Sequence, residues 1–208
     1  MGGKAGDKQC AEALGGDLPN WLAHYGFMVC IVDLKAEKGT DVIDEAIFGF
    51  IEKDVVAGSF EVIWCSTPAK APDKEAKVLT DRTHDVLAAA WDQHRTWGLE
   101  NPAADGDNPS LWEAPLIRRL AQLDRVVTVN FDRCRLGHAT RGPTQLLVAD
   151  HVNFLDLHGL TCNHSVNAHK EKASPTKQRG EYTPHLSQVV ANALYQGYRL
   201  QSFEKEDL

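Results

Sequence analysis

Apolar residues along this chain fall into short uninterrupted runs and into longer stretches with helical spacing. The runs cover residues 10–14, 27–32, 60–65, 125–131 and 145–148, and a further run ends at Glu100. Continuous apolar runs are typical of strands that are buried on both faces. We therefore expect these segments to be strands of a central sheet.

Between the runs, apolar residues recur every three or four positions, as in amphipathic helices. This spacing covers residues 18–25, 43–55, 74–94, 115–123 and 184–197. Gly58 and Gly197 are the expected ends of two of these helices, because glycine readily takes the left-handed conformation of a helix C-cap. Ser110 and Thr183 are expected to cap the starts of two others.

The order of these elements predicts an α/β fold. Strands alternate with helices until two strands follow each other, which indicates a doubly wound, Rossmann-like sheet with a modified end. A length of 208 residues suits one domain over residues 1–208. We expect flexible ends at 1–9 and 199–208, and a mobile loop over the polar residues 170–182.

Composition limits the class of protein. Hydrophobic residues make up 43% of the chain and charged residues 25%, which is ordinary for a folded protein. No apolar run approaches the length of a membrane span, and the N-terminus leads into no apolar signal segment. We therefore expect an intracellular protein that is not inserted in a membrane. The five cysteines include no Cys-x-x-Cys pair and are expected to be reduced thiols.

The formal net charge of −7 does not favour nucleic-acid binding through the chain as a whole. Basic residues do gather locally, at Arg133, Arg135 and Arg141 and again at Lys170, Lys172, Lys177 and Arg179. A local basic face therefore stays open as a hypothesis. Residues 140–144 could form a turn that touches phosphate, but a simple entry into the following strand is the favoured interpretation.

Glu100 is the candidate that the apolar pattern singles out. It ends an apolar stretch, and Asn101 and Pro102 follow directly. Pro102 restricts Asn101 to an extended conformation, which places the Glu100 carboxylate at a strand end. Open α/β sheets bind ligands at the carboxyl ends of their strands. A solvated strand end before a turn is the alternative.

Two further strand ends are candidates for a nucleotide site, although the full Gly-x-Gly-x-x-Gly motif is absent and a plain turn followed by a helix start is the favoured interpretation. Gly15 and Gly16 follow the first predicted strand, and Asp33 ends the second. Glycines let backbone approach a ligand closely, and a carboxylate accepts both ribose hydroxyls. Asp41 and Val42 could contact an adenine, although an N-cap at Asp41 is the simpler interpretation.

Taken in order, these motifs resemble a known family. The series runs from Gly15-Gly16-Asp17 through Asp33, Asp41, Ser66-Thr67-Pro68 and Leu99–Pro102 to Leu111-Trp112, Phe131-Asp132, Cys134, Gly137, Thr144, Cys162-x-His164 and Tyr182–Pro184. It is similar to the DNA methyltransferase-like proteins of phages and mobile retroelements. These are S-adenosylmethionine-dependent enzymes related in fold and motif order to the DNA cytosine-C5 methyltransferases. The similarity extends from about Cys10 to Leu194.

The resemblance implies a role for each matching residue. Gly15 and Gly16 would lie under the methionine moiety of S-adenosylmethionine, Asp33 would hold its ribose, and Asp41 and Val42 would contact its adenine. The Glu100 carboxylate would hydrogen-bond a DNA base that is flipped out of its helix. Asn101, Pro102 and Pro68 would shape the loops around that base.

One position departs from the family pattern. A thiol nucleophile is expected in the motif after Trp64, where this chain has Thr67, Pro68 and Ala69. Alanine cannot attack a base, so the covalent route to cytosine C5 is not open to this chain. Cys65 lies four residues earlier, within the predicted strand, and is expected to be a buried, inert thiol. A non-catalytic domain that keeps the fold to bind nucleic acid or protein is therefore the alternative function.

Cysteines and histidines of the carboxyl half raise a third hypothesis, a zinc-stabilised domain. Cys134, Cys162, His164 and His169 are its candidates, with His138, His151 and His158 nearby. Their spacing matches no familiar zinc finger or ribbon, so polar surface residues and no bound metal are the favoured interpretation. The hypothesis requires both cysteines and two histidines to reach a common point. Among the five tryptophans, which are otherwise expected in the core, Trp112 in its loop is the exception.

Overall fold

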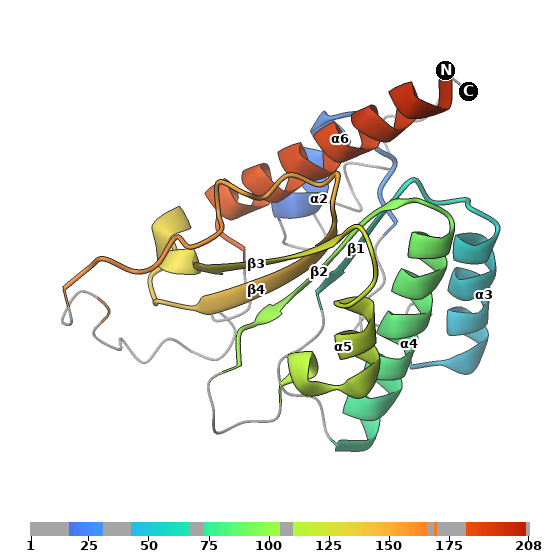
Figure 1. Ribbon diagram of the computed structural model, residues 1–208, viewed down its shortest axis with the longest axis horizontal. Helices are drawn as coiled ribbons and strands as arrows, with labels where there is room; N and C mark the ends of the chain where they lie inside the picture. Colours follow the sequence, from blue (N-terminus) through green and yellow to red (C-terminus); the bar gives the residue numbers. More distant parts are fainter. Residues whose placement is uncertain are drawn as a thin grey trace.

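A computed structural model describes residues 17–30, 43–66, 73–104, 110–165, 169 and 182–206. Within these ranges its helices and strands form three layers, with the sheet in the middle (Figure 1). The helices are α2 Asp17–His24, α3 Glu45–Val56, α4 Asp73–Asp92, α5 Pro115–Leu120 and α6 Pro184–Glu206, with short 3-10 helices η1 Leu111–Glu113 and η2 Arg133–Leu136. The strands are β1 Val62–Ser66, β2 Thr96–Pro102, β3 Val126–Asp132 and β4 Pro143–Ala149.

The four strands form one mixed sheet in the order β1-β2-β4-β3. β1 and β2 are parallel, whereas β4 is antiparallel to both of its neighbours, β2 and β3. It follows that β3 runs in the same direction as β2. The carboxyl ends of β1, β2 and β3 therefore meet at one edge, which we call the carboxyl edge.

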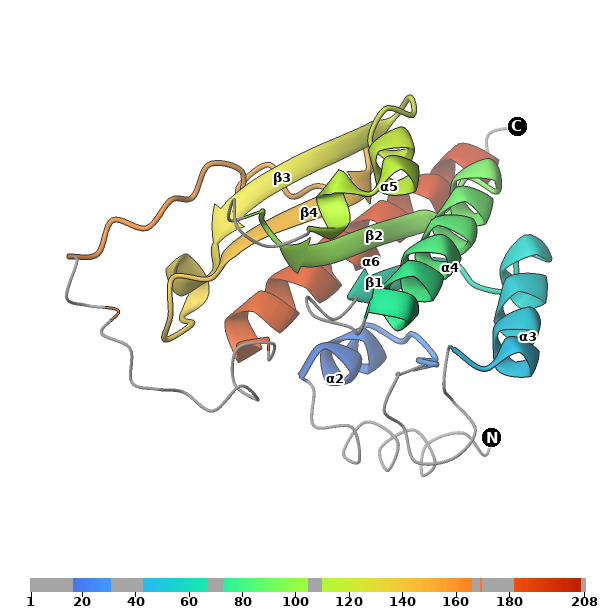
Figure 2. The ribbon, with the colours of Figure 1, turned by 90° about the horizontal axis from the view of Figure 1, so that it is seen from below.

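Helices cover both faces of the sheet. α4 packs on β1 and β2 with α5 beside it, and α3 packs on α4 in a cluster that also includes side chains of β1. On the opposite face, α6 crosses β2, and α2 packs against α6 (Figure 2). The phenol rings of Tyr25, after α2, and Tyr195, on α6, stack at 4.8 Å between ring centroids.

Burial of both faces of the sheet explains why the strands are continuous apolar runs in the sequence. In β4, Leu146, Leu147 and Val148 are each 0% exposed, although successive side chains of a strand point to opposite faces. Both faces must therefore be covered, as the sequence pattern indicated. On α4, the predicted apolar face includes Leu87 and Ala90, and both are fully buried.

Most predicted elements are confirmed within the described residues, and so are several of their boundaries. Gly58, with φ +69°, follows the end of α3, and its N–H donates to the carbonyl of Val55. The Ser110 hydroxyl accepts from the Trp112 N–H at the start of η1. The Thr183 hydroxyl accepts from the Leu186 N–H at the start of α6.

Three predictions about elements are wrong. Residues 27–30 do not form a strand: Phe27 packs against Tyr198 of α6, and Met28 is 92% exposed. The N-cap of α3 is Asp44 and not Asp41, because the Asp44 carboxylate accepts from the first N–H groups of this helix. α6 does not stop at Gly197 but continues to Glu206, through most of the range expected to be a flexible end.

The fold class is therefore mixed α/β, with a four-stranded mixed sheet between helices. The predicted modified end corresponds to β4, which is antiparallel between β2 and β3. The predicted strand over residues 10–14 and the end of the run 27–32 lie outside the described residues. Among the helices that the structure describes, none has the length and apolar character of a membrane span.

Candidate functional site

Glu100 lies at the carboxyl edge, where the pairing of the two parallel strands ends. It is the register partner of Ser66, the last residue of β1. Although Glu100 is charged, it is only 5% exposed. Its Oε2 accepts one hydrogen bond from the Ser66 hydroxyl at 2.8 Å and one from the Tyr182 hydroxyl at 3.2 Å. The predicted strand-end carboxylate is thus buried and held by two hydroxyl groups.

Tyr182, just before α6, links Glu100 to Trp64. Its hydroxyl oxygen accepts from the Trp64 indole Nε1 at 3.0 Å and donates to Glu100. Burial, together with the nearby negative charge of Glu100, raises the pKa of Tyr182 well above its ordinary value. The phenol therefore stays neutral at physiological pH and keeps its proton for the carboxylate. We call Trp64, Ser66, Glu100 and Tyr182 the Glu100 cluster.

The two carboxylate oxygens of Glu100 have different surroundings, because only Oε2 accepts the hydrogen bonds described above. Oε1 is buried and has no hydrogen-bond partner among the residues that the structure describes. Buried polar atoms nearly always have a partner, and an unsatisfied one costs about 1–3 kcal/mol. A ligand that brings an N–H donor would satisfy Oε1.

A glycine makes room for the Trp64 ring in this cluster. Gly98 lies next to Trp64 in the parallel pairing of β1 and β2. A Cβ atom at Gly98 would come within 2.4 Å of the Trp64 ring. Because Gly98 has no side chain, the indole can lie across β2 and reach Tyr182. Trp64 is thus a positioning residue of the Glu100 cluster as well as part of the core.

Trp112 holds η1 against the end of β2. Its indole Nε1 donates to the carbonyl oxygen of Pro102 at 2.9 Å. Asn101 is 3% exposed and pairs with Gln145 of β4 in the sheet register. Trp112, the one tryptophan that the sequence did not place in the core, therefore has a structural role: it joins η1 to the end of β2.

The other predicted site residues cannot be placed. Glu100 and Asn101 are described, whereas Gly15, Gly16, Asp33, Asp41, Val42, Pro68 and Ala69 lie outside the described residues. Cys65 is described in β1, where it is partly buried, and desolvation raises the pKa of its thiol to about 12. This pKa supports the prediction that Cys65 is inert.

Sequence reasoning assigned no chemistry to Ser66 or Tyr182. Both belong to motifs of the resemblance, but the hydrogen bonds that join them to Glu100 span 34 and 82 positions of the chain. Only the parallel register of β1 with β2 and the approach of α6 bring them together. The available signal for Ser66 was its place at a strand end, as for Glu100.

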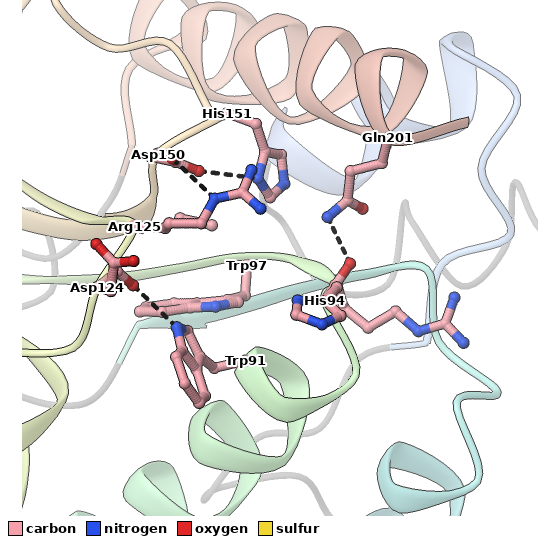
Figure 3. A pocket seen from close by; sticks show the side chains of 10 residues that line it. Trp91, His94, Trp97, Asp124, Arg125, Asp150, His151 and Gln201 are labelled. Atoms are coloured by element: carbon pink, nitrogen blue, oxygen red, sulfur yellow. Dashed lines mark hydrogen bonds and ion pairs between the residues drawn. The ribbon is translucent and has the colours of Figure 1, made fainter. Parts of the chain in front are cut away.

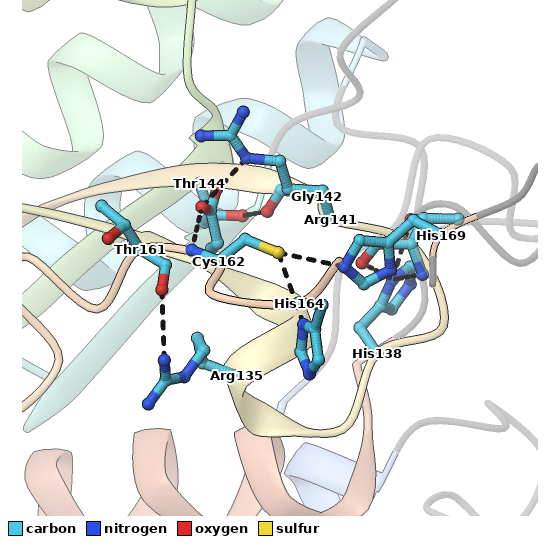
Figure 4. A network of polar contacts seen from close by, with 11 residues as sticks. Arg135, His138, Arg141, Gly142, Thr144, Thr161, Cys162, His164 and His169 are labelled. Carbon is cyan, nitrogen blue, oxygen red and sulfur yellow. Dashed lines mark hydrogen bonds and ion pairs between the residues drawn. The ribbon is translucent and has the colours of Figure 1, made fainter. Parts of the chain in front are cut away.

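A second group of polar residues lies beyond β3, at the same edge (Figure 4). The Asp132 carboxylate, whose side chain is 4% exposed, accepts from Arg141 Nε at 3.0 Å and from the Cys162 backbone N–H at 2.7 Å. Arg133 is itself buried. Arg141 is paired with Asp132, although its side chain is 60% exposed. Residues 140–142 lead into β4, as the simpler interpretation of that turn predicted.

Next to Asp132, four side chains with metal-ligating atoms converge. They are Cys134, Cys162, His164 and His169, and their ligating atoms all lie within 4.8 Å of one another. Hydrogen bonding to His164 lowers the pKa of Cys162, and burial raises that of Cys134. The requirement set by the zinc hypothesis, both cysteines and two histidines at a common point, is met.

A pocket of about 380 Å³ opens at the opposite ends of the strands, away from the carboxyl edge (Figure 3). Its lining includes Trp91, Trp97, Arg125, His151 and Gln201. Trp97 precedes Glu100 by three residues in β2, a separation of about 10 Å along the strand. The pocket therefore does not belong to the Glu100 cluster.

Comparisons of the chain with protein families, with curated proteins and with solved structures gave no match.

Proposed function

We propose that this chain is an S-adenosylmethionine-dependent DNA methyltransferase-like domain in which Glu100 binds the target base. The proposal rests on the motif order of the sequence and on one observation. Glu100 presents a buried carboxylate oxygen without a partner, among the described residues, at the edge where α/β sheets bind ligands. The order of the four strands is compatible with a Rossmann-like methyltransferase sheet.

The Glu100 cluster has the chemistry to bind a base. Ser66 and Tyr182 fix Oε2, so the orientation of the carboxylate is set before a ligand arrives. Oε1 would accept from an exocyclic amino group or a ring N–H of a base flipped out of the duplex. A neutral Tyr182 keeps its proton to donate to Oε2, which leaves Oε1 as the oxygen available to a base.

The cofactor part of the proposal rests on the sequence. Gly15, Gly16, Asp33, Asp41 and Val42 would hold S-adenosylmethionine, which supplies an electrophilic methyl group when bound. Ala69 removes the covalent route to cytosine C5. The chain also lacks the Asp-Pro-Pro-Tyr loop of adenine methyltransferases, so neither loop type assigns the target base.

A second function belongs to a different class. A non-catalytic domain that keeps this fold to bind nucleic acid or protein would need neither a thiol at position 69 nor a cofactor. Ala69 and the net charge of −7 favour this function. Binding of the cofactor separates the two.

The first experiment is calorimetric titration of the full chain with S-adenosylmethionine. We expect saturable binding that Asp33→Ala abolishes and that Asp54→Ala, a matched change on the exposed side of α3, leaves unchanged. No binding at millimolar cofactor would overturn the methyltransferase proposal in favour of the binding domain.

A second experiment tests Glu100 itself. Transfer of a labelled methyl group to duplex DNA should fall at least 100-fold in Glu100→Gln, while Glu113→Gln, in η1, should behave like the wild type. Circular dichroism checks that both variants are folded. Equal transfer by folded Glu100→Gln and the wild type would show that this carboxylate does not serve the base.

A further inference from the structure

The four metal-ligating side chains near Asp132 come from separate segments of the chain. Cys134 lies on η2, directly after β3, and Cys162 and His164 lie in the segment that follows β4. His169 approaches the same point from farther along the chain. Figure 4 shows His164 and His169 turned toward the sulfur of Cys162. Two cysteines and two histidines from separate segments that meet at one point are the ligand set of a metal site.

Distances within the group suit one small cation. Cys162 Sγ lies 3.3 Å from His164 Nδ1 and 3.1 Å from His169 Nε2. No pair of the four ligating atoms is more than 4.8 Å apart. With Zn–S near 2.3 Å and Zn–N near 2.0–2.1 Å, the edges of a tetrahedral site are roughly 3.3–3.8 Å. Shifts of about 1 Å or less would therefore complete a tetrahedron.

The neighbours of the ligands are arranged as around a metal site. His169 points Nε2 at the sulfur, while its Nδ1 lies 3.1 Å from the carbonyl oxygen of Ala139. A metal-bound histidine usually donates its other ring N–H in this way, which fixes its tautomer and orientation. The backbone N–H of Cys162 donates to the buried Asp132 carboxylate at 2.7 Å, which holds the loop carrying this thiol.

We propose that Cys134, Cys162, His164 and His169 form a structural Zn²⁺ site. A donor set of two thiols and two imidazoles favours Zn²⁺ over Mg²⁺ or Ca²⁺, which prefer oxygen ligands. Four protein ligands leave no open position, so the site is structural and not catalytic. Both cysteines are free thiols in the structure, as zinc binding requires.

The site has a task in the fold. It ties η2 to the segment that carries Cys162 and His164. η2 in turn holds the start of α6, because the Thr183 hydroxyl donates to the Leu136 carbonyl at 2.7 Å. Tyr182, the partner of Glu100, is the neighbouring residue. Zinc therefore stabilises the segment on which the geometry of the Glu100 cluster depends.

The test is the metal content of the full chain, purified without a histidine tag. We expect about one zinc per chain by elemental analysis. After exchange for Co²⁺, we expect the visible absorption of a tetrahedral ion with thiolate ligands. Cys162→Ser and His169→Ala should each lower zinc affinity at least 100-fold. Cys30→Ser and His185→Ala, at exposed positions outside the group, should keep full occupancy.

A measurement on the unaltered protein covers the case in which the variants do not fold. A chelator should release the zinc, make two further thiols reactive, and lower the melting temperature. Protein without zinc that cannot be loaded with it, or a Cys134–Cys162 disulfide found by mass spectrometry, would overturn the proposal. None of these measurements uses S-adenosylmethionine or DNA, so their outcome is independent of the proposed function.

Discussion

Removal of one hydroxyl group tests whether the Glu100 cluster is an ordered hydrogen-bond network. In Tyr182→Phe, Trp64 Nε1 loses its acceptor and Glu100 Oε2 loses one of two donors. The ring of residue 182 and its packing are kept. Any loss of stability therefore reports on the hydroxyl group alone.

The magnitude follows from these two bonds. A hydrogen bond to a charged group contributes about 1.5–3 kcal/mol, and a neutral one contributes about 1 kcal/mol. Ser66 still donates to Glu100, and the cluster is only partly buried, so the sum is reduced. We expect the free energy of unfolding to fall by about 2–3 kcal/mol, which corresponds to a melting temperature lower by about 4–12 °C for a domain of this size.

Urea denaturation followed by tryptophan fluorescence measures the change. The matched control is Tyr198→Phe on α6, whose hydroxyl donates to Glu61 at an exposed position, and we expect it to change stability by less than about 0.5 kcal/mol. In addition, Trp64→Phe should cost less in the Tyr182→Phe background than in the wild type, because their shared bond is already lost. Equal effects of Tyr182→Phe and Tyr198→Phe would refute the network.

Three further predictions concern the fold and the site. Leu147→Ala should destabilise the protein by about 2–5 kcal/mol in thermal denaturation, because Leu147 is fully buried. Leu200→Ala, at a position 53% exposed, should have little effect. Similar losses of stability in the two variants would contradict the burial of the sheet. Gly98→Ala should displace the Trp64 ring, which a Cβ would meet at 2.4 Å, and should shift its fluorescence at a cost of about 1–3 kcal/mol; an unchanged spectrum would contradict this packing. Cys65 is partly buried and its pKa is raised to about 12, so it should react with iodoacetamide at pH 8 much more slowly in the folded chain than after unfolding. Timed mass spectrometry measures both rates, and equal rates would contradict the raised pKa.

The amino-acid sequence by itself determined much of the local structure. Apolar runs located β1, β2, β3 and β4, because a strand buried on both faces is apolar at successive positions. Helical spacing located the helices, because a helix buried on one face is apolar every three or four positions. Glu100 was found in the same way, as a charged residue at the end of an apolar run before Pro102. The misassigned strand over residues 27–30 shows the limit of this reasoning. An apolar run does not say which surface will cover it, and Phe27 packs on α6 instead of joining the sheet.

Only the tertiary structure decided which distant residues meet. Strand direction cannot be derived from periodicity, so the antiparallel insertion of β4 and the pairing of Ser66 with Glu100 required the assembled sheet. The four candidate zinc ligands match no familiar spacing. Their convergence depends on how η2 and the segment after β4 fold back on each other. The local pattern of apolar residues shows which positions are buried. A site made of side chains far apart in sequence depends on how whole helices and strands pack.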